Sequence, residues 1–153
     1  MSKIPKEYLE RALELLDQMV VEEYKRLFGE KYLLEYSIDS TDDTCTTLKE
    51  TMVAMRVELH HQTVKYNVLA RLVTNTIVAV CVSKNTKDAR SLLQHVSPGS
   101  IVYMDAEYDV EYNYQYSQEK GIAIMVYPKF YGERLYKGKH RRQAQKEFKR
   151  GEV

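Results

Sequence analysis

The order of strand-like and helix-like segments constrains the fold of this chain most. Thr63 to Val73 alternates apolar and polar residues, and Ile77 to Val82 is almost entirely apolar and β-branched. Thr74-Asn75 between them is a plausible hairpin turn. Further strands are expected at Ser100 to Met104 and Ile122 to Tyr127, each after a helix-like segment. This pattern predicts a hairpin followed by two β-α-β crossovers.

The remaining segments complete the order. The first strand is expected at Tyr32 to Asp39, and the polar stretch 40–50 after it is typical of a loop. Helices are expected at 87–96 and 110–120. The whole chain then runs helix, β, β, β, α, β, α, β and a basic segment. It predicts an α/β protein with an RNase H-like mixed five-stranded sheet flanked by helices.

An amphipathic helix is expected over residues 6–28, with Pro5 in its first turn and Gly29 at its end. Its apolar residues recur at three- and four-residue steps, at Leu9, Ala12, Leu13, Leu16, Met19, Val20, Tyr24 and Leu27. We therefore divide the chain into an N-terminal helix packed on the core (1–30), the RNase H-like core (31–128) and a basic C-terminal segment (129–153).

The composition excludes several classes of protein. The chain has 153 residues, the size of one domain, and its 44% apolar and 29% charged residues are typical of a globular protein. It has no run of about 18 apolar residues and no signal-peptide core, so we expect a cytoplasmic protein that does not enter a membrane. Cys45 and Cys81 belong to no Cys/His cluster, so no zinc site is indicated.

The charge is unevenly distributed, although the net charge is only +1. Residues 129–150 hold nine Lys or Arg against two acidic residues, a net charge of +7. Such a segment suits a polyanion such as DNA. The expected phosphate contacts are Lys137, Lys139, Arg141, Arg142, Lys146 and Lys149. The alternative is a solvated helix with Phe148 packed inward.

Two aspartates each close an apolar strand. Asp39 lies in YSIDST and Asp105 in YMDAEYD. Strand ends in a mixed sheet are where carboxylates converge, and two close carboxylates require a proton or a cation between them. Mg²⁺ or Mn²⁺ suits such an all-oxygen site. The alternative is that both are N-cap or turn residues. Weaker candidates are Asp42, Asp43 and Asp109.

These motifs resemble the catalytic domain of DDE transposases from bacterial and archaeal insertion sequences, over residues 36–150. Asp39-Ser40-Thr41 matches the first catalytic aspartate, and Asp105-Ala106-Glu107-Tyr108-Asp109 matches the second. Lys65, Asp88 and EKGIAIMVYPK (119–129) occupy corresponding places. The resemblance implies Asp39 and Asp105 as metal ligands in Mg²⁺- or Mn²⁺-dependent cutting and joining of DNA strands. The implied partner is the DNA of transposon ends.

The match fails at the third acid that the family requires. Glu147 is the best candidate but its spacing fits poorly, and Glu152 is the next-to-last residue. We expect the third carboxylate to be missing, and therefore an impaired two-metal catalyst from a truncated, split or domesticated transposase. It would associate with a second copy or with an intact transposase. The alternatives are a non-catalytic DNA- or transposase-binding module of the same fold and, less well supported, a structure-selective nuclease.

A tyrosine-nucleophile mechanism with His60-His61 as metal ligands is disfavoured. The two histidines are adjacent, and adjacent residues of a strand point to opposite faces.

Overall fold

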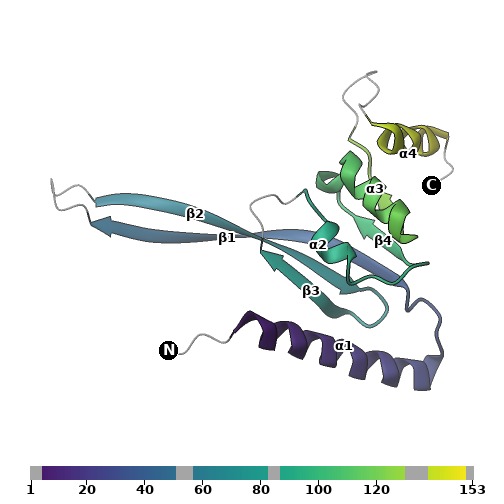
Figure 1. Ribbon diagram of the computed structural model, residues 1–153. Helices are drawn as coiled ribbons and strands as arrows, with labels where there is room; N and C mark the ends of the chain where they lie inside the picture. The colour runs from purple at the N-terminus through teal and green to yellow at the C-terminus, as the bar shows by residue number, and fades with distance from the viewer. Residues whose placement is uncertain (1–4, 51–56, 83–86, 130–137, 151–153) are drawn as a thin grey trace.

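The computed structural model describes residues 5–50, 57–82, 87–129 and 138–150, with the backbone alone at 42–50 and 57–64 (Figure 1). Its elements follow the predicted order. They are α1 (Lys6–Phe28), β1 (Glu35–Glu50), β2 (Val57–Arg71), β3 (Thr76–Val82), α2 (Arg90–Leu93), β4 (Ile101–Met104), the 3-10 helix η1 (Ala106–Tyr108), α3 (Glu111–Lys120), β5 (Ala123–Val126) and α4 (Lys139–Arg150).

The five strands form one mixed sheet in the order β3-β2-β1-β4-β5. β2 is antiparallel to both β1 and β3, whereas β4 is parallel to β1 and β5 is parallel to β4. β2 and β3 are thus joined by the short turn 72–75, and the parallel strands β4 and β5 by a crossover through α3, whereas α2 lies in the connection that carries the chain from β3 across the sheet to β4. This confirms the predicted α/β class and the RNase H-like mixed sheet flanked by helices.

The loop predicted at 40–50 is wrong, because these residues continue β1. The β1–β2 pairing runs from Tyr36↔Arg71 to Glu50↔Val57. β3 accompanies this hairpin only as far as Tyr66, and β4 only as far as Ile38. The rest of the hairpin extends away from the sheet as a two-stranded arm (Figure 1). A two-stranded ribbon that no third strand accompanies needs no apolar alternation, so its polar, threonine-rich sequence gives no strand signal.

One face of the sheet carries the core. Ile38, Leu69 and Val102 project from it and are at most 2% exposed. Leu92 and Leu93 of α2 pack over them in the same cluster. α2 is shorter than the helix predicted at 87–96. The chain turns beyond it at Gly99, whose φ of +82° favours glycine.

The opposite face of the sheet is open. Its cross-strand row Ala70, Ser37, Tyr103 and Met125 follows from the strand pairings. None of the described strand residues on this face is buried, and Tyr103 is 40% exposed. Residues that project here are therefore accessible to a ligand.

Helix α1 begins and ends where predicted, with Pro5 before its first turn and Gly29 at φ +79° after its last. Its packing face differs from the predicted one. It is anchored by Asp17, which accepts hydrogen bonds from Arg71 Nε (3.1 Å), Arg71 Nη2 (2.7 Å) and Thr76 Oγ1 (2.6 Å). The buried Arg71 guanidinium needs a carboxylate partner, so the Asp17 side of α1 faces the sheet. Most of the apolar residues predicted to face the core therefore point to solvent.

Candidate metal-binding and nucleic-acid-binding sites

Asp39 and Asp105 lie at the same level of the sheet, Asp39 within β1 and Asp105 directly after the neighbouring parallel strand β4. Ile38 and Met104 are register partners in the β1–β4 pair, and each aspartate is the next residue. Adjacent strands lie about 4.8 Å apart. Ile38 and Met104 face the core, so the two aspartates project to the open face, and both are exposed. The strand end predicted at Asp39 is wrong, because β1 continues through Asp39 to Glu50. The structure nevertheless places Asp39 beside the end of β4, where Asp105 follows, and the role of the pair as metal ligands stays a prediction.

Each aspartate also orders the backbone that follows it. Asp39 Oδ1 accepts a hydrogen bond from Ser40 N at 2.8 Å, and Asp105 Oδ1 accepts one from Ala106 N at 2.5 Å. Asp105 is the N-cap of η1. The N-cap interpretation of Asp105 is therefore correct as local structure. It is compatible with metal binding, because capping uses one carboxylate oxygen.

A buried polar pair lies behind the two aspartates. The Tyr108 hydroxyl donates to Asn67 Oδ1 at 3.1 Å, and both side chains are fully buried. Burial raises the pKa of Tyr108, as do the nearby charges of Asp39, Glu107 and Asp105, although a hydrogen bond with Ser40 opposes them. The phenol therefore stays protonated and remains a donor. Sequence reasoning missed Asn67, because nothing in its local pattern distinguishes it from other β2 residues.

The side-chain amide of Asn67 is only partly hydrogen-bonded. Its buried Nδ2 has no hydrogen-bond partner among the described residues. A buried amide donor without a partner is unfavourable, so this position depends strongly on its single bond to Tyr108.

The third acid is not found beside the pair. Glu147 accepts a hydrogen bond from Gln143 Nε2 at 2.8 Å and lines a hollow with residues of α3 and of the start of β5. Neither aspartate lines that hollow. Glu152 lies outside the described residues. Within the described part of the chain, no three His, Cys, Asp or Glu side chains gather closely enough to hold a metal.

The donor set fits one hard divalent ion. Two exposed carboxylates on neighbouring strands offer the oxygen ligands that Mg²⁺ and Mn²⁺ prefer, with water filling the remaining positions.

Asp109, a weaker candidate for the metal site, is instead a structural residue. It is 2% exposed and accepts hydrogen bonds from Arg141 Nε and Nη2, both at 2.9 Å. It also accepts bonds from the Tyr114 hydroxyl (3.1 Å) and Lys129 N (2.9 Å). These contacts fix the start of α4 against α3. The side chains of Asp42, Asp43, His60 and His61 lie outside the described residues.

Glu111 holds the same end of α4. Its carboxylate accepts hydrogen bonds from His140 N (3.1 Å) and Arg141 N (3.0 Å), and its Oε1 lies 2.9 Å from His140 Nδ1. Burial raises the pKa of Glu111, but these hydrogen bonds lower it more, so the net shift is downward. Glu111 acts as a cap for α4 supplied by another helix, which favours the ionised carboxylate at a helix N-terminus.

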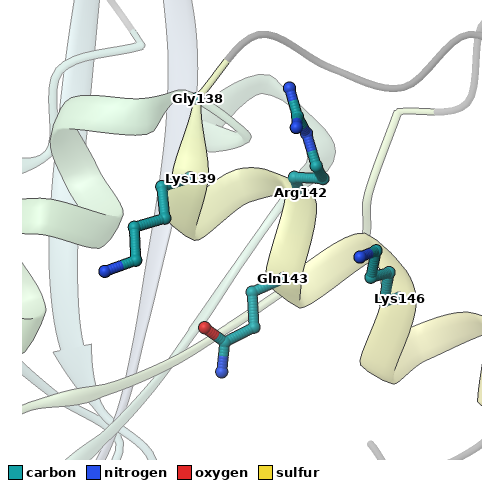
Figure 2. Close-up of a pocket in the computed structure, with 5 residues that line it drawn as sticks. All are labelled: Gly138, Lys139, Arg142, Gln143 and Lys146. Carbon is teal, nitrogen blue, oxygen red and sulfur yellow. The ribbon is translucent and has the colours of Figure 1, made fainter.

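The outer face of α4 is basic. Lys139, Arg142 and Lys146 line an open hollow with Gly138 and Gln143, and Figure 2 shows their side chains along the helix. Lys149 follows at the next helical step and is also exposed. Of the other predicted phosphate contacts, Arg141 turns inward to Asp109, and Lys137 lies outside the described residues.

The inner face of α4 packs on the domain. The rings of Phe148 and Tyr127 are in edge contact, with centroids 5.2 Å apart. Phe148 is therefore packed inward, as the solvated-helix alternative predicts. An outward basic stripe and an inward Phe148 occur together, so the packing does not exclude phosphate binding.

Comparisons with known proteins do not assign the chain to a family. No protein-family model matches the chain, and no curated protein matches it. A search of solved structures finds the Mos1 transposase paired-end complex with left transposon end. It shares 9% sequence identity, with a TM-score of 0.42 over 80% of this chain and 43% of that chain. The chain thus spans less than half of that protein's length. The fold assignment rests on the sheet order above.

Among the described residues, no helix combines the length and the apolar character needed to cross a membrane.

Proposed function

We propose that this chain is the metal-binding part of a DDE-transposase-type catalytic core that acts on DNA. The observation that carries the proposal is the placement of Asp39, within β1, beside Asp105, directly after the adjacent parallel strand β4, on an open sheet face. The motifs Asp39-Ser40-Thr41 and Asp105-Ala106-Glu107-Tyr108-Asp109 support the insertion-sequence type.

The chemistry follows from the two carboxylates. A divalent ion bound there supplies Lewis acidity for attack on a phosphodiester by water or by a 3′-hydroxyl. Asp39 and Asp105 hold it, and the buried Tyr108–Asn67 pair supports the backbone behind them. The open face leaves room for a DNA strand to approach these carboxylates.

The basic stripe of α4 is suited to hold the DNA backbone near this site. β4 and β5 are parallel, so Tyr127, which follows β5, lies at the same end of the sheet as Asp105. Phe148 rests on Tyr127, and Arg141 and Glu111 tie the start of α4 to the segment after Asp105. Lys139, Arg142 and Lys146 thus belong to the aspartate end of the molecule and supply nonspecific phosphate contacts.

We further propose that catalysis by this chain alone is impaired. Two-metal phosphoryl transfer needs ligands for a second ion, and looseness of about an ångström is damaging in such sites. No third ligand accompanies the pair among the described residues. The same observation favours the alternative of a non-catalytic module that binds DNA or an intact transposase. Association with a second copy or with an intact transposase would supply the missing acid.

A strand-nicking assay on supercoiled DNA with Mn²⁺ tests the proposal. The wild-type chain is expected to bind DNA and to nick it weakly, and Asp105→Asn is expected to remove the nicking. Asp88→Asn is the matched control, because the Asp88 carboxylate is already paired with Arg90. Strong nicking that depends on Asp105 would contradict the impairment. DNA binding without any nicking would favour the non-catalytic alternative.

A further inference from the structure

A hollow lies between helices α3 and α4, over the start of β5, and we call it the α3–α4 hollow. Gln118 of α3 and Gln143 and Glu147 of α4 give it polar lining, and Ile122 and Ile124 give it apolar contact surface. Its volume of about 260 Å³ is below the roughly 300–1,000 Å³ of pockets that hold drug-sized ligands. The hollow therefore suits a small group rather than a large ligand.

The polar side of the α3–α4 hollow presents hydrogen-bond acceptors. Glu147 Oε1 accepts a hydrogen bond from Gln143 Nε2 at 2.8 Å, so Glu147 Oε2 and the Gln143 amide oxygen are the atoms that this pair offers to a ligand. His140 also lines the hollow, and its Nδ1 lies 2.9 Å from Glu111 Oε1, which leaves Nε2 as the ring nitrogen for a ligand. Such a lining favours a ligand that carries N–H donors.

The basic stripe of α4 adjoins this hollow. Gln143 also lines the open basic hollow with Gly138, Lys139, Arg142 and Lys146, so the two hollows meet at this residue. Figure 2 shows Gln143 between Lys139 and Lys146 along the helix. A nucleotide carries the complementary set of groups, an anionic phosphate and a base with N–H donors. A cationic peptide side chain would match the acceptors, but the neighbouring cations would repel it.

We propose that the α3–α4 hollow holds one unpaired base of the DNA strand whose phosphates contact the basic stripe, and that Glu147 selects bases with an exocyclic amino group. The proposal rests on the DNA binding of the proposed function and adds base selectivity to it. Adenine, cytosine and guanine each carry an amino group that donates to a carboxylate, whereas thymine carries only carbonyl oxygens at its substituted positions, which a carboxylate repels. Glu147, which fits the third acid of the metal site poorly, thus has a different role.

Fluorescence anisotropy with labelled oligo-dC and oligo-dT of equal length, without divalent ions, tests the proposal. The wild-type chain is expected to bind oligo-dC about tenfold more tightly. Glu147→Gln should reduce this preference to about twofold or less, because an amide also donates to the thymine carbonyl. The matched control is Glu119→Gln, which removes the same charge from an exposed position of α3 and should keep the preference. Lys146→Gln should weaken the binding of both oligonucleotides equally.

The possible outcomes separate the base site from DNA binding in general. Equal affinity of the wild-type chain for the two oligonucleotides, or a preference that persists in Glu147→Gln, would overturn the base site and leave phosphate binding by the basic stripe intact. Binding of neither oligonucleotide would overturn the base site together with the proposed DNA binding.

Methyl NMR spectra of the full chain locate the base. Titration with dCMP is expected to shift the methyl signals of Ile122 and Ile124, whereas dTMP should leave them in place. Ala144→Leu, which adds volume to the lining of the hollow, should abolish the shifts. Shifts produced by N-acetylarginine amide and not by dCMP would overturn the proposal in favour of a site for a cationic peptide.

Discussion

Asp109, which lies between η1 and α3, and Arg141 of α4 form a buried ion pair. Two hydrogen bonds join them, each with an N–O distance of 2.9 Å. The Asp109 side chain is fully buried, whereas that of Arg141 is 18% exposed. The pair fastens the basic helix α4 to the segment that follows Asp105. It therefore links the proposed DNA-contacting surface to the proposed metal site.

Removal of Arg141 is expected to be strongly destabilising. Arg141→Gln leaves the Asp109 carboxylate buried without its counter-charge, which costs roughly 3–5 kcal/mol of unfolding free energy. Urea denaturation measures the change. Lys146→Gln, on the exposed face of the same helix, is expected to change it by no more than about 0.5 kcal/mol. Equal effects of the two substitutions would show that the ion pair is not structurally important.

The outward lysines of α4 are expected to act through phosphate contacts. Lys146→Gln should weaken duplex binding and reduce the slope of log K against log salt by about 0.9, one phosphate contact. Fluorescence anisotropy with a labelled duplex at several salt concentrations measures this slope. Lys120→Gln at the end of α3 is the control and should leave it unchanged. A slope that is the same in both variants would remove Lys146 from the DNA-binding surface.

The Asp17–Arg71 pair is expected to make stability depend on pH. Burial raises the Asp17 pKa, but hydrogen bonds from Arg71 and Thr76 and the charge of Arg71 lower it further, for a net downward shift from 3.8. A lowered folded-state pKa contributes stability above the unfolded-state pKa, and this is lost as pH falls through the folded value. The advantage of wild type over Asp17→Asn should thus be full near pH 6 and shrink below about pH 4. An advantage independent of pH between 6 and 2.5, measured by urea denaturation, would contradict this.

Tyr108→Phe is expected to destabilise the protein, because it removes the buried hydrogen bond to Asn67 behind the aspartates. Loss of the hydroxyl leaves the buried Asn67 amide without its described partner and costs about 1–3 kcal/mol of unfolding free energy. Thermal denaturation measures the loss, with Tyr116→Phe as the control, because the Tyr116 ring packs at the edge of the core. If both variants lose the same stability, the Tyr108–Asn67 bond has no special role.

Local signals explain what the sequence could predict. Pro5 and Gly29 mark the ends of α1 through their own backbone preferences, and the apolar run at 77–82 marks β3 directly. The sheet order followed from the order of elements, because hairpins and right-handed crossovers allow few alternatives. The local pattern also predicts the strand end at Asp105 correctly, whereas the strand end predicted at Asp39 is wrong because β1 continues to Glu50.

Long-range pairing explains what the sequence could not predict. The packing face of α1 depends on Asp17 meeting Arg71, which lies 54 residues away. Arg141 was grouped with the phosphate contacts because its charge is visible in the sequence, whereas its partner Asp109 is not identifiable as one. The hairpin arm was missed because a ribbon without neighbours loses the apolar alternation that marks a strand.

Isothermal titration with Mn²⁺ tests the central claim most directly. The wild-type chain should bind one ion weakly, and Asp39→Asn and Asp105→Asn should each abolish the binding because both carboxylates are needed. Asp88→Asn, which removes a carboxylate paired with Arg90, should bind like wild type. Mn²⁺ affinity that survives either Asp39→Asn or Asp105→Asn would contradict a metal site between these two carboxylates.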